Sequence, residues 1–240
     1  MANHQLLDNI THRNLRVITD RSAWYGDDIA ATLIFPLEFR RIQSEYPIAF
    51  QRNAETRGYE PIALFGFEER ENLYLGPNGW DASYIPLTVE RQPFLIGFKT
   101  STEDGVPQEE PVVHVDMDSP RVSETEGVPV FLEHGGQSPY LEHITRVLHT
   151  IHEGYAQNRR FSEALTSLQL LEPFSLEFEA GGGARRKLSG LYTLNEERLN
   201  GLDAASLESL HCSRFLESIY MVMASIGNFR ALIERRKHLA

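Results

Sequence analysis

The spacing of apolar residues changes near residue 138, and this change constrains the fold of the chain more than any other feature. Before it, short apolar runs such as residues 15–18, 29–34 and 61–67 are separated by turns rich in Gly, Pro and Asn, which predicts strands. After it, Ile144, Val147 and Ile151 recur at helical spacing. Because strands and helices are segregated along the chain, the sequence predicts the α+β class rather than a doubly wound α/β sheet.

We therefore expect a strand-rich part over residues 1–133 and a helix-rich part over residues 134–240, packed together as one compact domain. In the first part, residues 84–89 are expected to be a strand and the polar residues 99–111 a loop. In the second, helices are expected over residues 138–158, 161–171, 195–200, 204–211 and 213–236. A hairpin is expected from residues 174–178 and 187–192, joined by Gly181, Gly182 and Gly183.

The charge of the chain argues against a nucleic-acid partner. Its 240 residues include 34 acidic and 23 basic side chains, for a formal net charge of −11. A negative surface repels phosphate backbones unless it carries a local basic patch. The two basic triplets, residues 185–187 and 235–237, are short and lack interleaved aromatics, so we interpret them as a solvated turn and a helix C-terminus.

The sequence also predicts a cytoplasmic protein without a membrane span. Cys212 is the one cysteine, which excludes an internal disulfide framework. No stretch approaches the roughly 20 continuous apolar residues that a membrane helix needs. The first 20 residues lack the apolar core of a secretion signal.

Two groups of side chains are candidates for metal binding, although no standard catalytic motif accompanies them. Four histidines lie within residues 133–153, but their helical spacing points them in different directions, and only His149 and Glu153 are paired at i, i+4. Asp116 and Asp118 would share one face of a strand. The weak metal candidates are His114, Asp116, Asp118, His149, His152 and Glu153. The sequence identifies no catalytic residue and predicts no cofactor.

Aromatic residues are concentrated in one stretch of the strand-rich part, namely Tyr46, Phe50, Tyr74, Trp80, Tyr84 and Phe94. Such residues build hydrophobic cores, but Trp and Tyr carried by Gly- and Pro-rich turns also form recognition surfaces. The binding hypothesis places a ligand or partner against Tyr74, Trp80, Tyr84, Arg91 and Phe94.

Short motifs along the chain resemble the bacterial SapC family. They are Glu38 and residues 46–50 (YPIAF), 63–66 (ALFG), 71–74 (ENLY), 79–80 (GW), 84–86 (YIP), 92–94 (QPF), 190–192 (GLY) and 196–199 (EERL). The resemblance extends from about residue 14 to the final helix. It departs at residues 90–93, where family members often carry consecutive arginines and a tyrosine before Pro-Phe.

The resemblance implies an accessory role. Relatives are often encoded beside TonB-dependent receptors, halogenase-like proteins and cupin-like proteins, which suggests a part in nutrient uptake or in modifying a peptide or small molecule. The leading hypothesis is a non-enzymatic module that binds a peptide, a small ligand or a partner protein. A metal-assisted enzyme with a His/Asp site is one alternative, and a surface-layer component is another. The oligomeric state stays open.

Overall fold

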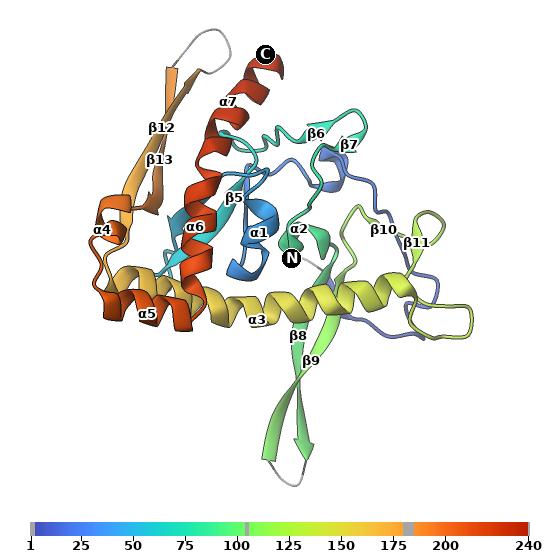
Figure 1. Ribbon diagram of the computed structural model, residues 1–240. Coiled ribbons are helices and arrows are strands. Elements are labelled where there is room, and N and C mark those ends of the chain that lie inside the picture. Colours follow the sequence, from blue (N-terminus) through green and yellow to red (C-terminus); the bar gives the residue numbers. More distant parts are fainter. Residues whose placement is uncertain (1–2, 104–105, 180–184, 240) are drawn as a thin grey trace.

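The computed structural model describes residues 3–103, 106–179 and 185–239 and confirms the α+β class (Figure 1). The elements are β1 (His4–Leu6), β2 (Arg16–Val17), η1 (Ala23–Tyr25), β3 (Ala31–Leu33), η2 (Pro36–Glu38), α1 (Phe39–Ile42), β4 (Ile48–Arg52), β5 (Tyr59–Leu64), β6 (Leu75–Gly76), β7 (Gly79–Trp80), α2 (Leu87–Glu90), β8 (Phe94–Glu103), β9 (Val106–Asp116), β10 (Val122–Ser123), β11 (Val128–Pro129), α3 (Pro139–Ser167), β12 (Leu171–Glu179), β13 (Arg185–Leu194), α4 (Glu196–Asn200), α5 (Ala204–Cys212), α6 (Phe215–Ser225) and α7 (Gly227–Leu239).

A five-stranded sheet joins segments from both sides of residue 138. Its order is β12-β13-β4-β5-β3, and every neighbouring pair is antiparallel. The predicted hairpin is therefore present as β12 and β13, and it meets β4 through Leu191 opposite Gln51 and Tyr192 opposite Phe50. The triple glycine expected to join the two strands, Gly181 to Gly183, lies outside the described residues.

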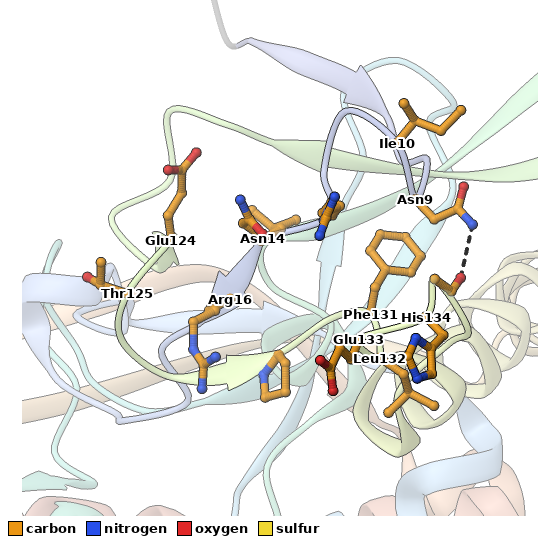
Figure 2. A pocket seen from close by; sticks show the side chains of 14 residues that line it. Asn9, Ile10, Asn14, Arg16, Glu124, Thr125, Phe131, Leu132, Glu133 and His134 are labelled. Atoms are coloured by element: carbon orange, nitrogen blue, oxygen red, sulfur yellow. Dashed lines mark hydrogen bonds between the residues drawn. The ribbon is translucent and has the colours of Figure 1, made fainter.

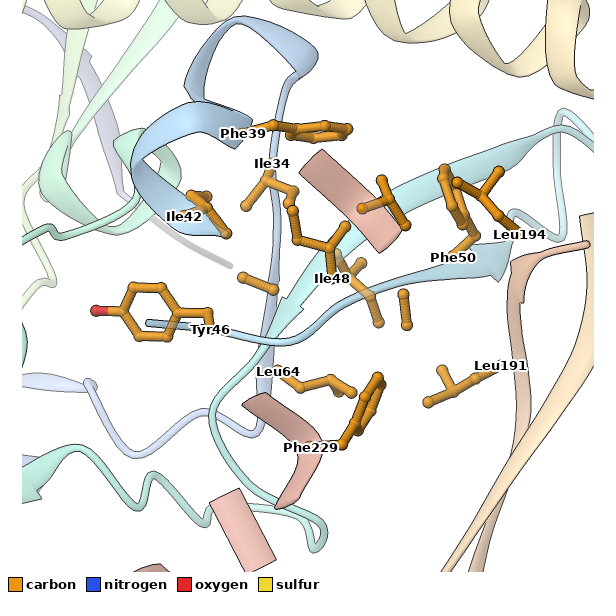
Figure 3. Close-up of a cluster of buried hydrophobic side chains, with 14 of the residues drawn as sticks. Ile34, Phe39, Ile42, Tyr46, Ile48, Phe50, Leu64, Leu191, Leu194 and Phe229 are labelled. Atoms are coloured by element: carbon orange, nitrogen blue, oxygen red, sulfur yellow. The ribbon is translucent and has the colours of Figure 1, made fainter. Parts of the chain in front are cut away.

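The main hydrophobic core lies between this sheet and the helices of the second half of the chain (Figures 1 and 3). Phe161 of α3 is fully buried, and its ring lies 5.9 Å from Phe39, 6.2 Å from Phe50 and 5.2 Å from Phe215. Phe229 of α7 packs against Phe174 of β12 at 4.8 Å. Apolar burial of this kind stabilises the fold by roughly 25 cal/mol per Å².

Helix α3 connects the main core to a second, smaller one. Ser138 caps it by accepting a hydrogen bond from the Leu141 backbone, and Pro139 occupies its first position. The N-terminal half packs on a second buried cluster, made by Leu15, Val17, Phe94, Val115, Val130, Leu141, Ile144 and Leu148. Two small antiparallel sheets, β1-β9-β8 and β10-β2-β11, supply the other side of this cluster.

The expected break between two helices over residues 138–158 and 161–171 was wrong, because α3 is continuous for 29 residues. The polar stretch at Asn158 suggested an end. In the fold this side chain is buried, and its Nδ2 donates to the Ile34 carbonyl at 2.9 Å. A tertiary contact thus satisfies a polar residue that would otherwise favour a helix terminus.

The single helix expected over residues 213–236 was also wrong, since α6 and α7 are separate helices. The Ser225 hydroxyl accepts from the Ile48 backbone N–H at 3.0 Å and donates to the Val222 carbonyl at 2.6 Å. The Ile226 backbone N–H then bonds three residues back, to Met223. The break coincides with this bond to β4, which the local sequence does not reveal.

Two expectations for the strand-rich part need correction. Residues 99–103 and 106–111 are not a loop but belong to the paired strands β8 and β9, because backbone pairing between the two segments holds them extended. Residues 84–89 do not form a strand, and Leu87–Glu90 is the short helix α2. Pro86 occupies its N-cap, and the Leu87 N–H bonds to Glu38 rather than to a neighbouring strand.

A buried ion pair fastens the segment before β3 to the loop before β10. Asp27 and Arg121 are 0% and 1% exposed, and Arg121 Nη2 lies 2.6 Å from Asp27 Oδ2. Arg21 Nη1 approaches the other carboxylate oxygen at 3.2 Å. Because both charges are compensated, this pair holds the N-terminal segment in place without leaving an isolated buried ion.

Candidate functional site

A hollow of about 840 Å³ opens between the N-terminal turn and the loop after β11 (Figure 2). We call it the groove. Its lining mixes apolar, amide and charged side chains, contributed by Asn9, Ile10, Arg13, Asn14, Leu15, Arg16, Glu124, Thr125, Pro129, Phe131, Leu132, Glu133, His134 and Gly135. Concave sites of roughly 300–1,000 Å³ are the usual size for ligand binding.

The first wall of the groove is a tight turn that presents Ile10. Asp8 Oδ1 accepts hydrogen bonds from the backbone N–H groups of Ile10 at 2.8 Å and Thr11 at 2.7 Å. The Thr11 and Ile10 N–H groups stabilise the carboxylate and lower the pKa of Asp8. Ile10 is 85% exposed, so the turn holds a large apolar side chain in water.

The second wall is the loop after β11, which presents Leu132. The Leu132 backbone N–H donates to the Gly136 carbonyl at 2.7 Å, and the Gly135 N–H donates to the Leu132 carbonyl at 2.9 Å. Gly135 has φ +85°, a conformation that favours glycine. Asn9 Nδ2 donates to the Gly135 carbonyl at 2.9 Å and so links the two walls, while Leu132 is 52% exposed.

Charged side chains line the rest of the groove. Arg16 Nε donates to the Gly127 carbonyl at 3.0 Å, which leaves its remaining N–H groups near the opening (Figure 2). Gly127 has φ +88°, and a Cβ atom there would lie 2.3 Å from the Val17 carbonyl oxygen. Only glycine therefore allows this turn to approach β2 and to place Glu124 across from Arg16.

Two further hollows adjoin the groove. A neighbouring hollow of about 330 Å³ shares Ile10, Arg13 and Asn14 with it. Another, of about 640 Å³, shares Asn9 and Phe131 and reaches the base of β8 and β9. The three hollows share lining residues and therefore lie next to one another along the N-terminal segment.

The groove contains the titratable side chains Glu124, Glu133 and His134, and no hydrogen bond joins any two of them in the described structure. Its fourteen lining residues, all within the described part of the chain, include no serine, cysteine or lysine. His134 is exposed and has no hydrogen bond to another described residue. The arrangement can bind polar and apolar groups, but it presents no paired nucleophile and base.

The residues of the aromatic hypothesis lie elsewhere, and two of them are inaccessible. Tyr74 is 2% exposed and Phe94 0%, so in this conformation neither ring reaches a ligand. Trp80 and Tyr84 are partly buried. Arg91 Nη1 donates to the Phe94 carbonyl at 2.6 Å, and burial lowers the pKa of Arg91.

Five aromatic residues contact one another through ring packing or hydrogen bonds, and we call them the aromatic network: Tyr46, Phe65, Tyr74, Trp80 and Tyr84. Trp80 Nε1 donates to the Tyr46 hydroxyl at 2.8 Å, and that hydroxyl donates to the Tyr84 carbonyl at 2.5 Å. Phe65 lies 5.3 Å from Tyr46 and 5.1 Å from Trp80, both edge-on. Burial raises the pKa of the Tyr46 and Tyr84 hydroxyls.

Glu38 anchors the edge of this network. Its carboxyl group is 2% exposed and accepts from the Phe35 N–H, the Tyr84 hydroxyl and the Leu87 N–H at 3.0, 2.7 and 3.1 Å. Burial outweighs these donors and raises the pKa of Glu38 to about 7. Unlike Asp27, this carboxyl has no ion-pair partner among the described side chains.

The metal candidates are dispersed rather than gathered. His149 pairs with Glu153 at 3.4 Å on the exposed side of α3, and His152 lies 5.4 Å from the Phe98 ring. Asp116 accepts from the Asp118 N–H at 3.1 Å, within a turn. His114 is on the middle strand β9, and its Nδ1 is buried without a partner. No group of three metal-binding side chains occurs within residues 3–103, 106–179 and 185–239.

The basic triplets are largely neutralised within the fold. Arg186 and Arg236 both bind Glu68 at 2.9 Å, and Arg236 also approaches Glu71 at 3.2 Å. Arg235 pairs with Asp81 at 2.7 Å and stacks over the Tyr74 ring. Two triplets far apart in sequence thus meet at one acidic loop instead of forming a free basic patch.

The groove was not among the predicted sites. Ile10 stands alone in a polar segment, and Leu132 ends the apolar run of residues 128–132, so neither residue by itself indicates a binding surface. One signal was present, because Asp8 precedes Ile10 by two residues, a spacing that allows an aspartate side chain to close a turn. The pair Gly135-Gly136 after Leu132 was a second signal of a tight loop.

The fold is thus of the α+β class, with a groove beside the N-terminal segment and a separate, internally bonded aromatic network. A family model described as SapC matches residues 7–232, and the chain belongs to this family. All fourteen residues that line the groove lie inside the matched range. Neither the curated proteins nor the solved structures gave a match. None of the helices in the described ranges is both long and apolar enough to cross a bilayer.

Proposed function

We propose that this protein is a non-enzymatic binding module and that the groove holds an extended peptide segment of a partner protein. The observation that supports this most directly is the pair of exposed side chains, Ile10 and Leu132, at 85% and 52% exposure on opposite walls. Each is held by hydrogen-bonded backbone rather than by apolar packing. Burying such residues on binding is favourable by up to about 1.5–3 kcal/mol for a fully buried side chain.

The polar lining favours a peptide over a purely apolar ligand. Asn14 and Thr125 provide donors and acceptors suited to a peptide backbone, and Arg13 and Arg16 provide cationic donors for carboxylates. Three neighbouring hollows along the N-terminal segment offer successive contact points for an extended chain. We therefore propose a segment with one or two apolar residues flanked by an acidic side chain. An accessory role in uptake or in peptide modification is the setting we propose for this binding.

A contact through Trp80, Tyr84 and Arg91 stays a second proposal. The exposed parts of these three side chains are available to a partner, with Tyr74 and Phe94 supporting them from the interior. Arg41 stacks over the Tyr84 ring at 5.4 Å and adds a cation at this surface. The double variant Trp80→Ala with Tyr84→Ala would abolish such binding while leaving groove binding intact.

Selection from a phage library of random dodecapeptides tests the groove. The bait is the full chain, and the selected peptides are then measured by fluorescence anisotropy against wild type and the double variant Ile10→Glu with Leu132→Glu. We expect at least a tenfold loss of affinity in the variant, equivalent to about 1.4 kcal/mol.

Tyr220→Glu provides a matched control, because Tyr220 is also 52% exposed but lies on α6. It should bind the selected peptides with wild-type affinity. Equal binding by the groove variant, or a selection that enriches no peptide, would contradict the proposal.

A further inference from the structure

The hairpin of β8 and β9 extends away from the body of the protein and is poorly covered (Figure 1). Its two strands pair from Phe94 opposite Val115 to Glu103 opposite Val106. On the far side of β9, strand β1 covers only His114 to Asp116. On the far side of β8, no strand pairs among the described residues. Two-stranded ribbons are marginally stable in water, so pairing with a further strand would stabilise this one.

The two edges of the ribbon differ in their free backbone groups. In an antiparallel pair, residues alternate between facing the partner strand and facing away from it. The Leu7 N–H bonds to the Val113 carbonyl at 2.9 Å, so the backbone of Val113 faces away from β8. By alternation, Pro111 and Pro107 face away as well. Since proline has no N–H, the outer edge of β9 lacks two of its donors.

The edge of β8 has no such protection. Phe98 is opposite Pro111, so its backbone N–H and C=O point away from β9, as do those of Ile96. Phe94 is the first residue of β8 whose backbone groups point away from β9, and both groups already have partners. Its N–H donates to the Arg91 carbonyl at 2.8 Å, and its carbonyl accepts from Arg91 Nη1. From Ile96 outward the edge contains no proline and is free to pair.

An apolar side chain and a hollow accompany this open edge. Phe98 is 49% exposed, and its ring contacts His152 of α3 at 5.4 Å. His152 also lines a hollow of about 460 Å³ that continues along α3 through Tyr155, itself 53% exposed, to Arg159. The open edge of β8, the exposed Phe98 ring and this hollow on α3 therefore lie next to one another.

We propose that two copies of this chain associate through β8, antiparallel, with Phe98 opposite Phe98 of the second copy. One two-fold axis then satisfies the open edge of both copies at once and covers both exposed rings. Residue 100 of the second copy lies opposite Ile96, so its strand continues toward the body beside the hollow on α3. The proline-blocked edge of β9 stops further strand addition, which limits the assembly to a dimer.

A second copy fits this edge better than an unrelated strand because the contact is self-complementary. An isologous interface needs the same patch on both partners, and here the open backbone, the exposed ring and the hollow all lie on one edge. A dimer also gives each hairpin two further strands on its open side, which relieves its marginal stability.

Light scattering after size exclusion tests the assembly with the full chain. The expected mass for wild type is about twice 27.4 kDa, and Phe98→Lys, which places two like charges opposite each other, should return it to one chain. Leu132→Lys is the matched control, because Leu132 is similarly exposed at 52% but lies in the groove, and it should stay dimeric.

A crosslink gives an independent readout that needs no loss of folding. In a Cys212→Ser background, Phe98→Cys should form a disulfide-linked dimer on oxidation, since opposed strand residues lie about 5.5 Å apart, within disulfide range. Leu132→Cys in the same background should remain unlinked. A monomeric wild type, a dimeric Phe98→Lys variant or an absent crosslink would each overturn the proposal. A monomer that instead captures an added extended peptide at β8 would assign the edge to another partner.

Discussion

In the aromatic network, large rings are buried and their polar atoms bond to one another, whereas in the groove apolar side chains stay in water. Tyr46 and Phe65 are both 0% exposed, while Ile10 is 85% exposed. The hydroxyl of Tyr46 accepts a hydrogen bond from Trp80 Nε1 and donates one to the Tyr84 carbonyl. The hydrogen bonds of the groove, in contrast, shape its backbone walls and leave the side chains free.

Apolar residues of the aromatic network stabilise the fold, whereas we propose that those of the groove bind a partner. The aromatic stretch is a predicted binding surface, and in the fold its rings and polar groups also contact one another, which stabilises the core. The exposed side chains of Ile10 and Leu132 contribute little packing to the interior. Substitutions in the network should therefore change the free energy of unfolding, and substitutions in the groove should change binding.

Removal of the central ring of the network should have the largest effect. Phe65→Ala eliminates edge-on contacts with Tyr46, Trp80 and Tyr74 and leaves a cavity, so the free energy of unfolding should fall by about 3–5 kcal/mol. Urea denaturation followed by circular dichroism measures this loss. Leu132→Ala in the groove should change stability by less than about 0.5 kcal/mol. Similar losses in the two variants would erase the contrast between the regions.

The second-largest effect should be a pH dependence of the free energy of unfolding that is caused by Glu38. Its pKa is raised from the ordinary value of 4.5 to about 7, so the folded protein binds this proton more tightly than the unfolded chain does. Stability should then fall as pH rises from about 4.5 to about 7 and level off above, by roughly 3 kcal/mol. The Glu38→Gln variant should lose this dependence.

Denaturation midpoints across this pH range, for wild type and Glu38→Gln, provide the measurement. Glu142→Gln, at an exposed position of α3, is the control and should retain the wild-type slope. Parallel curves for wild type and Glu38→Gln would show that the buried carboxyl does not control the stability of the network.

A smaller loss is expected when one hydrogen bond of the network is removed. Trp80→Phe keeps an aromatic ring beside Phe65 but deletes the Nε1 donor to the Tyr46 hydroxyl. The expected cost is about 1 kcal/mol, measured by thermal unfolding. A stability equal to that of wild type would indicate that solvent satisfies the Tyr46 hydroxyl instead.

The smallest effect on stability, and the clearest on binding, is expected from the arginines of the groove. Arg13→Ala combined with Arg16→Ala should shift unfolding by only about 0.5 kcal/mol. Affinity for a selected acidic peptide should fall several-fold, and the loss should shrink at high salt because exposed charges are screened. Anisotropy titrations at two salt concentrations test both points, and a salt-independent affinity would exclude a role for these cations.

Some features of the fold were readable from local pattern. The periodicity of Ile144, Val147, Leu148 and Ile151 identified the first half of α3, and all four side chains are buried. The hairpin expected from residues 174–178 and 187–192 followed from its apolar segments and the turn residues between them. These signals are local, because helical and strand periods are imposed by the backbone itself.

Other features depended on contacts between distant residues. Asn158 stays inside a helix because it bonds to Ile34, and α6 ends where Ser225 bonds to Ile48. The polar segments at residues 99–103 and 106–111 are held as strands by pairing with each other, which composition alone does not disclose. Each of these outcomes required a partner more than a few positions away.

By itself, the sequence determined the α+β class, the SapC family and the amphipathic first half of α3. The tertiary structure alone decided which apolar residues are buried. It placed Tyr74 and Phe94 in the interior and left Ile10, Leu132 and Phe98 in water. The physical reason is that burial depends on what the rest of the fold packs against a side chain, whereas propensity and periodicity act within a few residues.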